Sequence, residues 1–266
     1  IAAAAFCVST AERWQEFVQK WRKIAEHAGF DVRQFHMTEF AACRRDNRCQ
    51  QCLSGNTSAI EHPWQNWTEG KRQNVLNRMA KALVKHVEYG VGQAYTKADY
   101  DEHVRNSPAR QAANEPIGDE YLTFAVQRCG GSLAEWRADN ARADRLKFVF
   151  DTASKKERRE IAEVFFAAAN DRAERENGIE QWFNPELGVS YESRRESHQL
   201  LAADMLAWTI ATLRAREMFR AGRFVEVFWL AKLFVSTDHI KLGYMHKDTL
   251  AQWEKDKLEQ HDHPIS

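Results

Sequence analysis

The sequence feature that most constrains the fold is a short apolar run that ends on a carboxylate. Residues 146–150 are apolar except for Lys147, and Asp151 follows them directly. Short apolar runs bounded by turn formers are typical of buried strands. We therefore predict a buried central strand that delivers Asp151 to the sheet edge where ligands gather in open α/β folds. Thr152 and Ser154 keep a second interpretation open, because Asp, Thr and Ser also cap helices.

The rest of the chain alternates strand-like and helix-like segments, which predicts a single α/β domain over residues 1–266. Small apolar residues predict a strand over 1–8, and weak alternation with two glycines that allow close backbone approach predicts another over 89–95. Apolar residues at three- and four-residue spacing predict the long helices. These helices span residues 10–28, 68–87, 157–175 and 197–219. We interpret residues 41–67 as an irregular insertion, and residues 97–143 and 224–258 as helical additions.

Local signals give finer expectations about where elements begin and end. Ser9 and Glu12 have the spacing of a capping box, and Gly29 is the expected stop of the first helix. Gly130-Gly131 should divide the helical pattern of 119–143 into two helices. We expect residues 35–40 on a strand end or loop, and residues 179–191 to be irregular.

Charge and composition exclude several classes of protein. The chain has 38 basic and 38 acidic residues, so only local clusters can indicate a nucleic-acid partner. No stretch approaches the roughly 20 apolar residues of a membrane span, which predicts no membrane partner. The five cysteines are odd in number and three crowd between Cys43 and Cys52, unlike a secreted disulfide framework. We therefore expect a cytoplasmic protein.

Four ionisable residues lie in otherwise apolar stretches of the sequence: His36, Glu39, Asp151 and Asp204. Asp204 has apolar neighbours on both sides, and a charge there is costly unless it is paired, hydrogen-bonded or bound to a cation. The structural interpretation is an aspartate bonded to a neighbouring strand or to an arginine. The functional interpretation takes Asp151, Asp204 and Glu39 as ligands of Mg²⁺ or Mn²⁺, hard cations that prefer oxygen. Two such ions about 4 Å apart can cleave phosphodiester bonds.

Four motifs follow one another along the chain: an aromatic helix stripe (Trp14, Phe17, Trp21), Phe35-His-Met-Thr-Glu-Phe40, Phe148-Val-Phe-Asp151 and Ala203-Asp-Met-Leu-Ala-Trp208. In order and spacing they resemble the bacterial domain of unknown function 3800 family, over about residues 1–250. The resemblance implies a ribonuclease-H-like fold, with a mixed central sheet and helices on both faces. It also implies an acid cluster that binds Mg²⁺ or Mn²⁺ and serves a nuclease (a hydrolase).

The resemblance assigns roles to individual residues. Asp151 would be the strand acid and Asp204 the acid of the late helix, both binding metal. Glu39 would be a further ligand or would orient the attacking water, and His36 would assist by hydrogen bonding or proton transfer.

The sequence departs from the family pattern at two places. The family's first strand carries an Asp-Glu-Ser or similar motif whose Asp is the central metal ligand, and this motif is absent here. The chain opens inside an apolar run, which predicts a truncated N-terminal strand. The family's Leu-Gln pair also differs, because Leu201 stands three residues before Asp204 while Gln199 lies two residues earlier. The alternative function is a non-catalytic module that keeps the fold and binds nucleic acid or protein.

Local clusters suggest two further kinds of partner. Basic residues lie near the predicted acids, at Arg44, Arg45, Arg48, Lys155, Lys156, Arg158, Arg159, Arg194 and Arg195. They are as compatible with solvated helix faces as with a nucleic-acid backbone. Cys43, Cys49 and Cys52, with His36 or His62 as a fourth ligand, form half of a zinc pattern. Free thiols on a loop are the favoured interpretation there, because a second C-x-x-C is missing.

Overall fold

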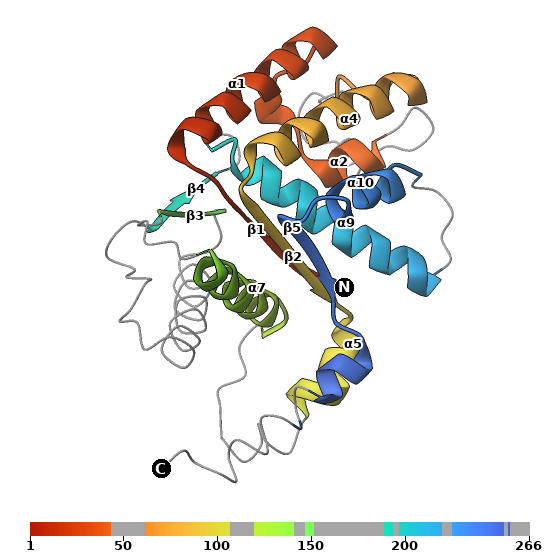
Figure 1. Cartoon of the computed structure of the whole chain (residues 1–266). Helices are drawn as coiled ribbons and strands as arrows, with labels where there is room; N and C mark the ends of the chain where they lie inside the picture. Colours follow the sequence, from red (N-terminus) through yellow and green to blue (C-terminus); the bar gives the residue numbers. More distant parts are fainter. Residues whose placement is uncertain are drawn as a thin grey trace.

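The computed structural model describes residues 1–43, 62–106, 120–140, 147–151, 189–193, 197–219, 225–252 and 255. Figure 1 shows their helices and strands as ribbons. Their order is β1 (Ala2–Val8), α1 (Ala11–Ala28), the 3-10 turn η1 (Val32–Gln34), α2 (Met37–Ala42), α4 (Glu69–His86), β2 (Tyr89–Tyr95), α5 (Lys97–Tyr100), the π-helical turn η2 (Asp101–Arg105), α7 (Glu120–Asp139), β3 (Phe148–Asp151), β4 (Val189–Glu192), α9 (Leu200–Phe219), α10 (Val225–Val235) and β5 (Ile240–Tyr244).

A mixed three-stranded sheet lies at the centre, in the order β1-β2-β5. Strand β1 runs antiparallel to β2, with Ala2 opposite Tyr95. Strand β5 runs parallel to β2, with Gly90 opposite Ile240. The strands predicted over 1–8 and 89–95 are confirmed, and so is the mixed α/β class. Strand β5 was not predicted.

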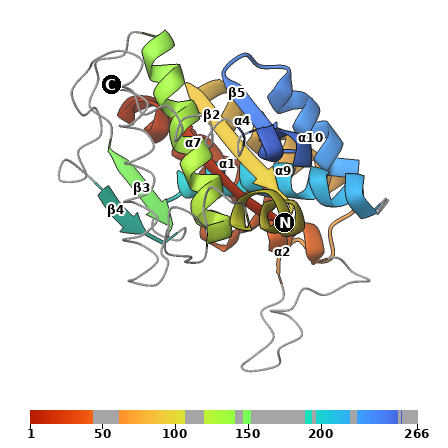
Figure 2. The same ribbon diagram turned by 90° about the horizontal axis from the view of Figure 1, so that it is seen from below.

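Helices cover both faces of this sheet. Figures 1 and 2 show α7 on one side and α1, α4, α9 and α10 on the other. Side chains of β1 alternate accordingly: Ala4 and Phe6 join the hydrophobic cluster under α7, while Ala5 and Cys7 pack against the cluster of the other helices. Both faces of β1 are therefore covered, which explains why the strand is apolar throughout.

The glycines of β2 allow helix α9 to approach the sheet closely. A Cβ placed on Gly90 would lie 3.1 Å from Leu206 Cδ1, and one on Gly92 would lie 3.5 Å from Ile210 Cγ2. A larger residue at Gly90 would crowd Leu206 of α9, and one at Gly92 would crowd Leu242 of β5, 3.1 Å from the added Cβ. The close backbone approach predicted from the two glycines is confirmed, and α9 is the approaching element.

Helix α1 is defined by local capping and by an aromatic stripe. Thr10 is its N-cap and accepts a hydrogen bond from the backbone N–H of Arg13, while Gly29 ends it with φ of 88° in the left-handed region. Trp21 is fully buried, and its indole N–H donates to the carbonyl oxygen of Met79 at 2.9 Å. The predicted stop is confirmed. The cap predicted at Ser9 is wrong, because that hydroxyl donates to the carbonyl of His86 instead.

Helix α7 runs without interruption through Gly130-Gly131, so the predicted break there is wrong. Gly130 is buried, and the neighbouring Cys129 thiol lies 3.6 Å from the carbonyl oxygen of Ala4. Small residues at this point let α7 contact β1 closely, and tertiary packing outweighs the low helix propensity of glycine. Burial also raises the pKa of the Cys129 thiol, which makes it an unreactive core residue.

Two predictions about short segments are also corrected. Residues 37–42 form helix α2 rather than a strand end or loop, and β4 begins within the stretch 179–191 that was expected to be irregular. The predicted helix over 157–175 lies outside the described residues. Among the described helices, none combines the length and the apolar character that crossing a bilayer would require.

Strand β3 confirms the predicted strand that ends at Asp151, but it is not a central strand. It pairs in parallel with β4 in a separate two-stranded sheet, where Asp151 stands opposite Glu192. Of its four residues only Phe150 is buried, and Asp151 is exposed. Phe150 contacts Phe6 of β1 with ring centroids 5.7 Å apart, so the small sheet packs beside the large one.

Candidate functional site around helix α2

Helix α2 brings two of the predicted site residues together. Asp204 projects from α9, and its Oδ2 accepts a hydrogen bond from the backbone N–H of Met37 at 2.9 Å. The same oxygen lies 3.5 Å from Nδ1 of His36, the residue that precedes the helix. The two side chains are 15% and 26% exposed, so the pair is half-buried and still accessible to solvent.

The His36 ring also caps α2. Its Nδ1 accepts a hydrogen bond from the backbone N–H of Thr38 at 3.2 Å. This bond requires an unprotonated Nδ1, whereas a favourable contact with the Asp204 carboxylate requires a proton there. The same nitrogen can therefore serve the helix cap or the carboxylate contact, according to whether it carries a proton.

Glu39 lies one turn further along α2 and has a different partner. Its Oε2 is 3.9 Å from Nε2 of His62. The His62 ring is buried and stacks on Trp64, with centroids 4.9 Å apart. Two acid–histidine pairs therefore lie at helix α2: His36–Asp204 at its start and Glu39–His62 one turn along it.

Asp151 lies in the small sheet, whose strand β3 also contacts α9. It ends β3 in the two-stranded sheet, next to Glu192 of β4 in register, whereas Asp204 is bonded at α2. Within the ranges that the structure describes, no group of three or more His, Cys, Asp and Glu residues is arranged to hold a metal ion. The ligand set of Asp151, Asp204 and Glu39 remains a prediction from sequence.

The zinc pattern and the basic clusters fall largely beyond the described residues. Cys43 is fully buried at the end of α2, while Cys49 and Cys52 lie outside the described ranges. The same holds for all of the basic residues named above as neighbours of the predicted acids. They give the candidate site neither support nor opposition.

Arg72 is the residue near this site that the sequence interpretation missed. It is 2% exposed, and it donates hydrogen bonds from Nη1 to the carbonyl oxygens of Cys43 and Trp64 at 3.2 and 3.1 Å. Its Nη2 donates to the carbonyl oxygen of Phe40, whose ring lies 4.3 Å below the guanidinium. One signal was present: Arg72 occupies the apolar stripe of its helix, three and seven residues before Val75 and Met79.

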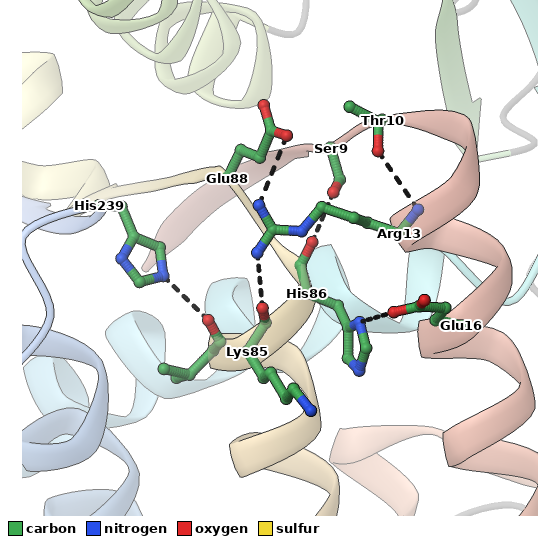
Figure 3. A network of polar contacts seen from close by, with 9 residues as sticks. Ser9, Thr10, Arg13, Glu16, Lys85, His86, Glu88 and His239 are labelled. Atoms are coloured by element: carbon green, nitrogen blue, oxygen red, sulfur yellow. Dashed lines mark hydrogen bonds and ion pairs between the residues drawn. The ribbon is translucent and has the colours of Figure 1, made fainter.

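A second polar network lies at the other end of α4 (Figure 3). There Arg13 donates to the carbonyl oxygen of Lys85 at 2.6 Å and pairs with Glu88 at 3.4 Å. The ring Nε2 of His239 lies 3.0 Å from the carbonyl oxygen of Val84. These groups satisfy the last carbonyls of α4. At 1.5 Å rise per residue, this end lies about 20 Å along the helix from Arg72.

Comparison with known proteins gives no match. No protein-family model, no curated protein and no solved structure matches this chain. The resemblance to the domain of unknown function 3800 family therefore rests on the four sequence motifs alone.

Proposed function

We propose that the protein is a cytoplasmic nuclease of ribonuclease-H-like type, which hydrolyses phosphodiester bonds with a divalent cation. Asp204 and His36 would form its chemical centre. The observation that supports this proposal is their geometry: an acid on a helix that crosses the sheet is fixed 3.5 Å from an imidazole in a half-buried position. Two acid motifs that lie far apart in the sequence meet there.

The described residues fit a cation only in part. Mg²⁺ is commonly held by one or two carboxylates, waters and substrate phosphates, so Asp204 fits as one ligand. Of the other predicted acids, Glu39 faces His62, and Asp151 ends β3 in the two-stranded sheet. A bound cation would polarise a phosphoryl oxygen and help to deprotonate water. The remaining ligands would have to be supplied by substrate, by water or by residues outside the described ranges.

The His36–Asp204 pair can hold and move a proton. When Nδ1 carries the proton, the carboxylate stabilises that tautomer, and Nε2 is then the nitrogen that can accept a proton from water. Once Nε2 has accepted that proton, both ring nitrogens carry one, and the Asp204 carboxylate stabilises the resulting imidazolium at Nδ1. His36 would act as the general base, and Asp204 would orient it.

The test uses substitutions that preserve the caps of α2. Asp204→Asn keeps an oxygen that can accept from Met37 but removes the charge, and His36→Asn keeps a good N-cap but removes the imidazole. With single- and double-stranded DNA and RNA and added Mg²⁺ or Mn²⁺, we expect each variant to lose about 10²-fold or more in cleavage rate. Asp31→Asn, which alters an exposed acid paired with Arg33, is the matched control. Wild-type cleavage that persists in both site variants would refute the proposal.

A non-catalytic binding module is the second candidate, and a specific observation favours it. Asp204 serves as the hydrogen-bond acceptor for the first N–H of α2, which is a sufficient structural reason for its burial. In this case wild-type protein would bind labelled oligonucleotide, or a protein partner, without cleaving nucleic acid. Asp204→Asn would then leave the fluorescence anisotropy titration unchanged.

A further inference from the structure

Helix α2 is held at both ends by side chains from other helices. At its start, Asp204 of α9 accepts the N–H of Met37. At its end, Arg72 of α4 donates to the carbonyl oxygens of Phe40 and Cys43. A helix of six residues has little stability of its own, so these contacts and packing determine where it lies.

The two contacts match the charge distribution of the helix. The partial positive charge at the start of a helix favours a carboxylate, and the partial negative charge at the end favours a cation. Arg72 is almost completely buried, and burying a guanidinium is costly unless its donors are satisfied. Its planar fork reaches carbonyl oxygens on two segments at once, which a lysine ammonium cannot reproduce with the same geometry.

The third contact of Arg72 connects it to the second acid–histidine pair, Glu39–His62. Nη1 also donates to the carbonyl oxygen of Trp64, the residue on which His62 stacks. His62 in turn faces Glu39 on α2. The Arg72 guanidinium therefore holds both α2 and the segment with His62 and Trp64, which packs against Glu39.

We propose that Arg72 is the positioning residue of the His36–Asp204 centre, acting through α2. This inference rests on the proposed function only in its kinetic consequence. Arg72 contacts neither His36 nor Asp204 in the bonds described above; it sets the distance between them by fixing the far end of the helix that carries His36.

The expected kinetic effect follows from geometry. Misplacing a reacting group by about 1 Å can cost about 10²-fold in rate. Arg72→Lys should therefore lower kcat by tenfold or more and leave KM within about twofold. A loss confined to KM would contradict a positioning role.

A spectroscopic measurement tests the positioning role independently of cleavage. At a fixed pH, the ring ¹⁵N resonances of His36 report which nitrogen carries the proton and what it contacts. In Arg72→Lys we expect these resonances to shift and the amide protons of Met37 and Thr38 to exchange faster. The inference is overturned if both stay at their wild-type values.

Two controls separate positioning from general destabilisation. Leu76→Ala removes a buried side chain of the same helix, and Arg13→Lys alters the arginine that bonds the opposite end of α4. Both should leave the His36 resonances in place, whatever they do to the melting temperature. If the His36 resonances shifted equally in Leu76→Ala and Arg72→Lys, Arg72 would have a structural role only.

A rescue experiment covers the case in which Arg72→Lys does not fold. Arg72→Ala leaves a space beside the Phe40 ring and the carbonyl oxygens. Ethylguanidinium at millimolar concentration should restore the His36 resonances, and ethylammonium at the same concentration should not. Equal rescue by both cations, or by neither, would contradict the role assigned to the guanidinium. If wild-type protein does not cleave nucleic acid, the proposed function fails, while these resonances still decide the positioning role.

Discussion

The three-stranded and two-stranded sheets differ in how far their strands are covered. Strand β2 is buried at six of its seven positions, between α7 and α9, whereas β3 is buried only at Phe150. The acids on or beside the sheets differ in the same way: Asp204 is 15% exposed and bonded, and Asp151 is exposed. An apolar run thus marks a strand, but the helices that cover it decide how deeply the strand and its acid are buried.

The largest expected effect concerns the covered sheet. Leu206 is fully buried above Gly90, and Leu206→Ala should lower the free energy of unfolding by about 2–5 kcal/mol. Val149→Ala in the half-buried β3 should cost less than about 1.5 kcal/mol. Urea unfolding of both variants measures the difference. Equal losses would mean that the small sheet belongs to the same cooperative core.

A smaller effect separates the two acids. Asp204→Ala leaves the N–H of Met37 without its acceptor and should cost about 1–2 kcal/mol. Asp204→Asn keeps an acceptor and should cost less. Asp151→Ala changes an exposed residue and should stay within about 0.5 kcal/mol. Thermal unfolding of the three variants checks this order, and a cost for Asp151→Ala equal to that for Asp204→Ala would contradict it.

The smallest effect is a loss of stability in mild acid, which arises from two histidines near the helices that cover the three-stranded sheet. Burial lowers the pKa of His86 and of His198 below the ordinary value of 6.5, and for His86 this outweighs the opposite effect of Glu16. The unfolded chain takes up these protons near pH 6.5 and the folded chain does not, so stability is highest above that pH and falls below it.

Urea midpoints at pH 7.5, 6.5 and 5.5 measure this dependence. The double variant His86→Gln with His198→Gln should reduce it. The described parts of β3 and β4 contain no histidine, so hydrogen exchange should show protection lost first in α4 and α9. An unchanged pH dependence in the double variant would show that other groups are responsible.

Sequence predicted the elements whose causes are local. The first helix stops at Gly29 because a left-handed residue is needed there, and glycine adopts that conformation easily. The long helices confirmed as α1, α4 and α9 have apolar residues at helical spacing over many turns. In each case the signal and the structure lie within the same few residues.

Prediction from the sequence failed for elements whose structure depends on residues far away in the chain. Helix α2 exists because Asp204 and Arg72, which lie far from it in the chain, satisfy its two ends. The pair of glycines in α7 is helical because β1 accommodates close packing. Both members of the candidate centre are indicated by the sequence, because Asp204 needs a partner in apolar surroundings and His36 belongs to one of the four motifs. That Asp204 lies beside His36 and accepts the backbone N–H of Met37 follows from no local pattern.

The order of the strands has a consequence for how the protein is made. The central sheet joins residues near the beginning of the chain to β5, which starts at Ile240. A ribosome adds about 5–20 residues per second, so β2 waits on the order of ten seconds for its parallel neighbour. During that interval one edge of an apolar strand is open to other chains. Synthesis of this protein should therefore depend on chaperones more than its size alone suggests.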